Sequence, residues 1–307
     1  MKAGAGEPTS GRSAEVMGRL GPTVSVVIPA KNEARNLPEV LGALPAELHE
    51  VILVDGDSTD DTVAVALELR PDIVVVGQSR KGKGNALASG FAVATGDFIV
   101  MLDADGSTDP SEIPRFVEAL MAGADFAKGS RFMSGGGSSD ISRIRRMGNF
   151  WLNRIVNLIY GTRYTDLCYG YNAFRRECLE VMSLDAGQVD LTEADLELET
   201  DLVRDRRDRD KGDDVVMLWG DGFEVETLIN VRIAKAGLRV VEVPSFEHSR
   251  NFGSSNLNAF SDGIRVIRTI HAERRRGARR DAIASAGAPR EDGASWAVLS
   301  TMVEEAS

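Results

Sequence analysis

Four short apolar runs, each followed by a helical pattern, constrain the fold of this chain most. The runs are VSVVI, EVILVD, DIVVV and DFIVMLD. Their length and β-branched content are typical of strands buried on both faces, and four successive strand–helix units predict a doubly wound, mostly parallel sheet. Ligands bind beyond the carboxyl ends of the strands in such sheets. The first candidates for a site are therefore the polar residues that close the strands: Lys31, Asn32, Glu33, Asp55, Asp57, Asp103 and Asp105.

The pattern changes after Phe132. A helix is predicted through Ile144, Met147, Trp151, Ile155 and Leu158, and a last amphipathic helix through Leu257, Phe260, Ile264 and Ile267. We expect residues 1–22 to be a flexible lead-in, 23–276 to form one domain with a charged insertion at 184–214, and 277–307 to be a disordered tail.

The overall charge excludes some classes of partner. A net charge of -11 and a pI near 4.9 argue against nucleic-acid binding, which needs an electropositive surface. Cys168 and Cys178 are too few for a disulfide framework, and we interpret both as buried thiols. Without a signal-peptide pattern or a membrane-spanning run, the expected location is the cytoplasm, with peripheral membrane contact at most.

Asp103 and Asp105 follow the fourth apolar run two positions apart, so both carboxylates can reach one ion. Their hard oxygens suit Mg²⁺ or Mn²⁺. With 47 acids in 307 residues, about seven acid-x-acid pairs are expected by chance, so the position after a strand carries the prediction. The alternative is a solvated turn, or a cap for the helix that follows Pro110.

Asp55 and Asp57 close the second strand, where the base or ribose of a nucleotide would lie. The alternative is that Asp57, Ser58 or Thr59 caps the next helix.

The loop SRKGKGNALASG places Gly82 and Gly84 beside Arg80, Lys81 and Lys83, just before a helix. Backbone N–H groups and positive charge at that position suit a diphosphate. The alternative is an ordinary basic surface loop.

Taken together, the motifs resemble those of the family 2 glycosyltransferases of GT-A fold, in the branch similar to dolichol-phosphate mannosyltransferase. The resemblance covers about residues 24–270. The motifs that carry it, in chain order, are VVIPAKNE, VDGDSTDDT, GKGNALASGFAVATGD, MLDADGSTDP, GSRF, TDLCYGYNAFRR, GFEVET, GLRVVEVP and RNFGSSNLN. The chain departs from the usual family pattern at VDGDS and DLCYGYNAF, which affects the choice of acceptor.

The resemblance implies a GT-A sheet with a mixed acceptor-side half, a UDP- or GDP-linked sugar donor, and transfer with inversion. It implies that Asp103 and Asp105 bind a metal-diphosphate and that Arg131, Arg250 and Ser254 lie near donor or acceptor phosphates. The residues it assigns to the nucleotide are Pro29, Ala30, Asn32, Glu33 and Asp57.

A hydroxyl acceptor needs a base, whereas a phosphomonoester is already mostly ionised at pH 7. Glu224 and Glu226, at the start of a predicted helix, are the leading base candidates and Asp166 is the third; the alternative is that they are acids favoured by a helix dipole.

The favoured acceptor is a polyprenyl phosphate at the inner face of the cell membrane, supported by the apolar stripe from Leu257 to Ile267 and the arginines at 274–280. The alternatives are a soluble hydroxyl acceptor, such as a glycan or a small metabolite, and a catalytically silent sugar-nucleotide-binding protein. The sequence does not determine an oligomeric state.

Overall fold

The computed structural model describes residues 21–184, 186, 220–253 and 263–276. The described residues up to Ile270 belong to one compact unit, and residues 271–276 belong to a second. Ser254, Leu257, Phe260 and nearly all of the charged insertion lie outside the described residues.

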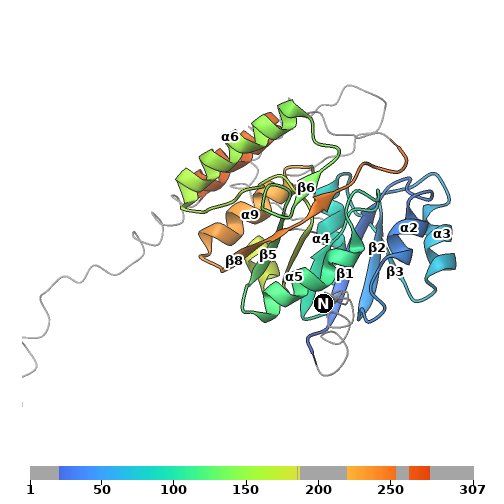
Figure 1. Ribbon diagram of the computed structural model, residues 1–307. Helices are drawn as coiled ribbons and strands as arrows, with labels where there is room; N and C mark the ends of the chain where they lie inside the picture. The colour runs from blue at the N-terminus through green and yellow to red at the C-terminus, as the bar shows by residue number, and fades with distance from the viewer. Residues whose placement is uncertain (1–20, 185, 187–219, 254–262, 277–307) are drawn as a thin grey trace, which may run out of the picture. The chain divides into compact units, whose positions relative to one another are not determined.

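A seven-stranded sheet forms the centre of the molecule (Figure 1). Its strands in spatial order are β3 (Val74–Gly77), β2 (Glu50–Asp55), β1 (Val24–Ala30), β4 (Phe98–Met101), β7 (Asn172–Arg175), β5 (Phe126–Ser130) and β8 (Val240–Pro244). Only β7 runs antiparallel to its neighbours, β4 and β5. The predicted doubly wound, mostly parallel sheet with a mixed second half is confirmed.

Helices cover both faces of this sheet, because alternate residues of each central strand point to opposite sides. On one face, Val26 and Ile28 of β1 join a core with α2 (Leu37–Gly42), α3 (Thr62–Leu69) and α5 (Ile113–Met121), which follows the short helix η1 (Pro110–Glu112). On the other, Val27 joins a core with α4 (Lys83–Val93), α7 (Cys178–Met182) and α9 (Val225–Lys235).

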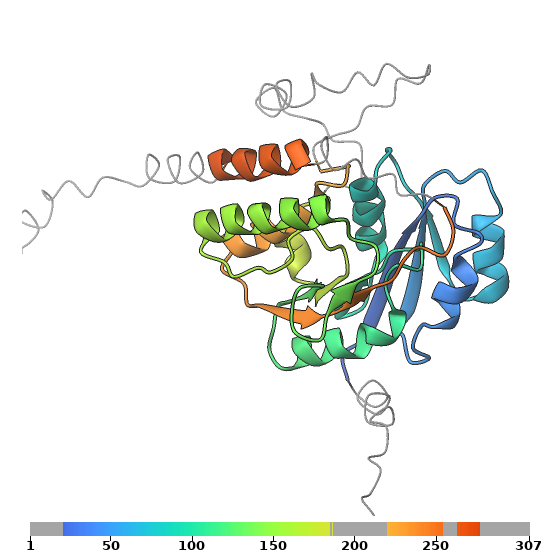
Figure 2. The ribbon, with the colours of Figure 1, turned by 45° about the horizontal axis from the view of Figure 1, so that its top comes forward.

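A third apolar cluster lies beside the sheet. Leu152 and Val156 of α6 (Arg143–Tyr160) contact Val231 of α9 and Val266 of a helix that spans 263–276. Figure 2 shows α6 beside α9 at one side of the molecule. A short two-stranded sheet of β6 (Gly137–Ser138) and β9 (Phe246–Glu247) connects the start of α6 to the segment after β8.

The sheet reverses its winding between β1 and β4, because the chain builds β2 and β3 on one side of β1 and then places β4 on the other. The loops after β1 and β4 therefore diverge at their carboxyl ends and leave room for a ligand. The strand-closing residues of these loops include Glu33, Asp103 and Asp105. The fold thus brings the main predicted residues to the expected edge.

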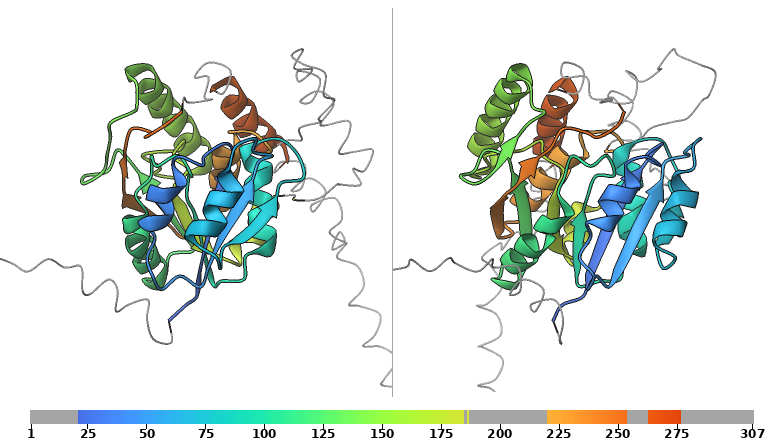
Figure 3. Two further views of the ribbon diagram at one scale, coloured as in Figure 1. Left: turned by 90° about the vertical axis from the view of Figure 1, so that its right-hand side faces the viewer. Right: turned by 45° about the vertical axis from the view of Figure 1, so that its right-hand side comes forward.

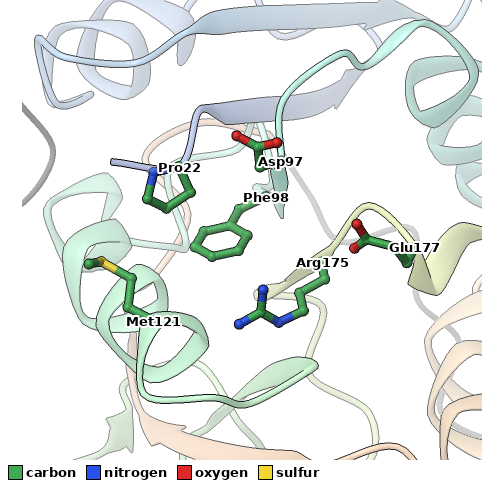
Figure 4. A pocket seen from close by; sticks show the side chains of 6 residues that line it. All are labelled: Pro22, Asp97, Phe98, Met121, Arg175 and Glu177. Atoms are coloured by element: carbon green, nitrogen blue, oxygen red, sulfur yellow. The ribbon is translucent and has the colours of Figure 1, made fainter. Parts of the chain in front are cut away.

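A pocket of about 400 Å³ lies at the opposite edge (Figure 4). It is lined by Pro22, Asp97, Phe98, Met121, Arg175 and Glu177. The Arg175 guanidinium there donates hydrogen bonds to the carbonyls of Leu120 and Ala124. Since the pocket adjoins the amino ends of β1 and β4, it is separate from the candidate site.

Candidate active site

The loops after β1 and β2 are joined by side-chain hydrogen bonds. Asn32 has a left-handed backbone (φ 58°), which asparagine tolerates better than most residues. Its side-chain oxygen accepts a hydrogen bond from Thr59 N (2.7 Å), and its own N–H donates to Ser58 Oγ (3.0 Å). Glu33 N donates to Thr62 Oγ1 at 2.9 Å. These contacts hold the predicted nucleotide residues of both loops in one polar rim.

Asp55 and Asp57 differ within this rim. Both Asp55 carboxylate oxygens accept from Ser58 N at 3.3 Å, so Asp55 fixes the turn. Asp57 is exposed and has a positive φ of 62°. Neither it nor Ser58 or Thr59 caps α3, whose N-cap position is Asp61. The capping alternative is wrong, and Asp57 stays a prediction for the nucleotide.

Asp103 is paired with a cation of the chain itself. Lys83 Nζ, in the first turn of α4, lies 2.7 Å from Asp103 Oδ1 and 3.0 Å from Glu226 Oε1 of α9. Burial disfavours the Lys83 ammonium, but the two carboxylates outweigh this effect and raise its pKa above the ordinary value. The fold therefore links a predicted metal ligand, a predicted phosphate-loop lysine and a predicted base.

Gly170 closes this cluster from the loop before β7. A β-carbon at this position would lie 3.0 Å from Lys83 Nζ and 3.2 Å from Glu226 Oε1. The absence of a side chain lets the loop approach the charged groups. Sequence reasoning did not single out Gly170, although it lies within the quoted motif TDLCYGYNAFRR.

Asp105 is buried and pairs with a second cation. Arg250 Nη2 lies 2.8 Å from Asp105 Oδ2, while Oδ1 accepts from Ser107 N at 2.9 Å. The segment after β9 reaches this turn because His248 N donates to Ser107 O at 2.8 Å. Arg250, which was predicted to lie near donor or acceptor phosphates, thus contacts a predicted metal ligand, and its role toward phosphate stays a prediction. The cap of η1 is Asp109, whose side chain accepts from Ser111 N, so neither Asp103 nor Asp105 has the alternative capping role.

Glu33 adds a third carboxyl group near the two aspartates. Burial raises the pKa of Glu33, the hydrogen bond from Asn36 opposes this shift, and the negative charges of Asp105 and Asp103 reinforce it.

The basic loop before α4 is less open than predicted. The Gly84 N–H donates to Asp221 O at 2.7 Å, and the Arg80 guanidinium forms a bidentate pair with the Asp221 carboxylate at 2.9 and 3.0 Å. The expectation of a Gly84 amide open to phosphate is therefore wrong in this arrangement, because the segment before α9 packs on the loop. Lys81 is exposed and Lys83 faces Asp103.

Arg131 and Asp166 form a buried ion pair beneath the site. Arg131 Nε and Nη2 contact the two Asp166 oxygens at 2.7 and 2.9 Å, and Nη1 contacts Glu247 at 2.9 Å. Burial opposes the guanidinium charge, but these carboxylates raise the pKa of Arg131 above its ordinary value. With both residues buried and paired, their predicted roles toward phosphate or as a base gain no support from the geometry.

Two further residues correct or extend the sequence interpretation. Cys168 is exposed rather than buried, because it lies in the loop between α6 and β7, whereas Cys178 is buried as expected. Lys128 is fully buried in β5 and donates to Tyr169 O at 3.2 Å. A lysine inside an apolar strand was the signal that could have identified it.

The carboxylate oxygens of Asp103 and Asp105 suit a metal ion that binds together with a diphosphate. In the described ranges, no group of three or more His, Cys, Asp or Glu side chains is arranged to hold an ion. Two aspartates alone leave most of the coordination sphere to be filled, as is usual for Mg²⁺ bound with substrate phosphates. The residues present therefore fit a metal-diphosphate better than an isolated ion.

Comparison with known proteins identifies the family. Residues 25–182 match the model of glycosyl transferase family 2. The chain belongs to this family. It is a glycosyltransferase, and the resemblance drawn from its motifs is confirmed.

Two relatives lie in the polyprenyl-phosphate branch of the family. Undecaprenyl-phosphate mannosyltransferase of Micrococcus luteus is 30% identical over 253 residues, covering 80% of this chain and 91% of the relative. Polyprenol monophosphomannose synthase of Mycolicibacterium smegmatis is 37% identical over 184 residues, covering 54% and 69%.

A solved structure shares the fold of this glycosyltransferase. Glucosyl-3-phosphoglycerate synthase of Mycobacterium tuberculosis, in complex with Mn²⁺, UDP-glucose and phosphoglyceric acid, superposes with a TM-score of 0.60. The match covers 88% of this chain and 85% of the other, at 21% identity. The GT-A fold is therefore confirmed.

Proposed function

We propose that this glycosyltransferase moves a sugar from a UDP- or GDP-linked donor to a polyprenyl phosphate at the inner face of the cell membrane, with inversion and with Mg²⁺ or Mn²⁺. The observation that carries the proposal is the pair Asp103 and Asp105 at the end of β4, each facing a cation of the chain. The names of the two polyprenyl-phosphate relatives support the acceptor. The Mn²⁺ and UDP-glucose of the solved structure support the donor and metal.

In this proposal Asp103 and Asp105 would hold the metal, which would supply positive charge for the departing diphosphate. Lys83 and Arg250 already lie against these carboxylates and supply two further positive charges beside the leaving group. The polar rim of Asn32, Glu33 and Asp57 orients the nucleoside. Fixed charges of this kind need little reorganisation when the bond between the sugar and the diphosphate breaks.

The acceptor decides whether a protein base is needed. A phosphomonoester is mostly ionised at pH 7 and attacks without one. A hydroxyl acceptor requires a base, and Glu226, whose carboxylate contacts Lys83, would be the nearest candidate. Replacement of Glu224 and Glu226 by Gln separates the two cases. If either glutamate is the base for a hydroxyl acceptor, the enzyme should lose turnover with that acceptor.

The test is a transfer assay with labelled UDP- and GDP-sugars, Mn²⁺ and a polyprenyl phosphate. We expect label to enter the organic phase, to stop entering it with EDTA and to resume with added Mn²⁺. The anomeric configuration of the product, read by NMR, tests inversion. Label that reaches only water-soluble hydroxyl acceptors would contradict the proposed acceptor, and transfer unaffected by EDTA would contradict the metal.

A further inference from the structure

The outer face of α6 is apolar and exposed. The exposed fractions are 71% for Ile144, 59% for Met147, 51% for Phe150, 59% for Trp151, 38% for Ile155 and 87% for Leu158. Most are spaced three or four residues apart, so they form one stripe along a helix of 18 residues, about 27 Å long. An apolar stripe of this length on a surface is typical of a contact with another molecule or a membrane.

The inner face of α6 carries polar as well as apolar side chains. Asn149 and Asn153 are buried there together with Leu152 and Val156. The helix predicted from Ile144, Met147, Trp151, Ile155 and Leu158 is confirmed, but those five residues face away from the core. Burial within this chain therefore does not explain the stripe.

A second helix packs against α6. Val266 and Ile270 of the helix at 263–276 pack in one cluster with Leu152 and Val156 of α6. Ile264 and Ile267 of that helix are exposed. Figure 3 draws the two helices as neighbours, and the packing of Val266 and Ile270 joins the part of the second helix up to Ile270 to α6.

The charge on this surface is opposite to that of the whole chain. α6 contains Arg143, Arg145, Arg146 and Arg154 and no Asp or Glu, although the chain carries a net charge of -11. Arg143, Arg146 and Arg154 are exposed. Apolar side chains flanked by arginines, with a tryptophan among them, match an interface that has an anionic surface above an apolar interior.

We infer that α6 and the neighbouring helix up to Ile270 dock on an anionic lipid bilayer, with the stripe from Ile144 to Leu158 entering the headgroup region. A second copy of the chain fits less well, because a twofold contact through α6 would bring the arginines of both copies together. None of the described helices is long and apolar enough to cross a membrane.

The same helix connects this surface to the candidate active site. Asn149 Nδ2 on its inner face donates to Asp166 Oδ1 at 3.1 Å, and Asn153 Oδ1 accepts from Leu167 N at 2.8 Å. The loop that they hold continues to Gly170, which lies against Lys83. The inference rests on the proposed function, because a polyprenyl acceptor is held in a bilayer. With α6 docked on that bilayer, the phosphate of the acceptor would lie within about one helix diameter, 10–12 Å, of this loop.

The test is flotation of the full chain with vesicles of phosphatidylcholine, alone or mixed with phosphatidylglycerol. The variant Trp151→Glu/Leu158→Glu places two negative charges in the stripe. The matched control, Leu67→Glu/Leu69→Glu, makes the same change at two exposed leucines of α3. We expect the wild type and the control to float with anionic vesicles, and the stripe variant to bind at least about tenfold more weakly.

Two further measurements separate the explanations. The stripe variant should keep wild-type transfer to a short, water-soluble prenyl phosphate, because its substitutions lie on the outer face. Equal flotation of both variants would overturn the inference. It would also be overturned if sedimentation equilibrium showed a dimer for the wild type and a monomer for the stripe variant, while neither of these two proteins bound vesicles. Wild-type flotation without any transfer to prenyl phosphate would support the docking surface and contradict the proposed acceptor.

Discussion

Replacement of Lys83 by Met tests whether its ammonium stands between Asp103 and Glu226 as a substitute for a metal. Methionine is one atom shorter than lysine and similarly unbranched, but it lacks the charge, so two carboxylates are left beside each other. Loss of one partner from a buried ion pair costs about 3–5 kcal/mol. The Asp103 side chain is 27% exposed, so water screens part of this loss, and we expect about 3 kcal/mol.

The assay is thermal unfolding, followed by circular dichroism, with EDTA or with Mn²⁺. A loss of about 3 kcal/mol corresponds to a fall in Tm of about 6–12 °C for a domain of this size. Mn²⁺ should stabilise the variant more than the wild type, because in the variant the ion no longer competes with an ammonium for Asp103. Transfer activity should fall by about 10²–10³-fold, as expected when a charge beside the leaving group is lost.

Lys81→Met is the matched control, since this neighbouring lysine is exposed. Its Tm should stay within about 2 °C of the wild type, because surface substitutions usually change stability by less than 0.5 kcal/mol. The reasoning is refuted if Lys83→Met and Lys81→Met unfold at the same temperature, or if Mn²⁺ shifts the Tm of Lys83→Met no more than that of the wild type.

Three further outcomes are expected. Gly84→Ala should lower the free energy of unfolding by about 3 kcal/mol or more, because a β-carbon would lie 1.7 Å from Gly220 O. Gly148→Ala should raise it by about 0.5–1 kcal/mol, because a β-carbon there would meet nothing within 4 Å. Both are measured by urea unfolding, and equal effects would contradict this reasoning. Burial lowers the pKa of Lys128, so the unfolded chain binds the proton more readily and stability should rise as pH approaches 10.5; Lys128→Met should flatten that rise. Arg131→Met should cost about 3–5 kcal/mol at pH 7 by leaving two buried carboxylates unneutralised, and a loss under 1 kcal/mol would show that the pair is dispensable.

Local patterns in the sequence determined the first half of the fold. A short β-branched run that is buried on both faces, followed by a helical pattern, specifies a strand and its covering helix without knowledge of distant residues. The position of Asp103 and Asp105 at a strand tip follows from the run that precedes them, and their part in a ligand site follows from the edge rule for doubly wound sheets. These predictions needed only neighbouring positions in the chain.

The contacts of the site depended on the order of the strands, which the sequence does not encode locally. The insertion of β7 between β4 and β5 brings Gly170 to Lys83, and the packing of α9 brings Glu226 to the same ammonium. The pairing of Arg131 with Asp166 and Glu247 has the same origin.

The direction in which α6 faces was also decided by tertiary structure. A helical period defines a stripe of apolar residues, but it does not say whether that stripe meets the core or the surroundings. Here Asn149 and Asn153 find hydrogen-bond partners in the loop before β7, so the side of the helix that carries these two asparagines is the one that is buried. The sequence thus determined the elements and the candidate residues, while the long-range packing decided which of these residues meet and which face of α6 is left for a partner.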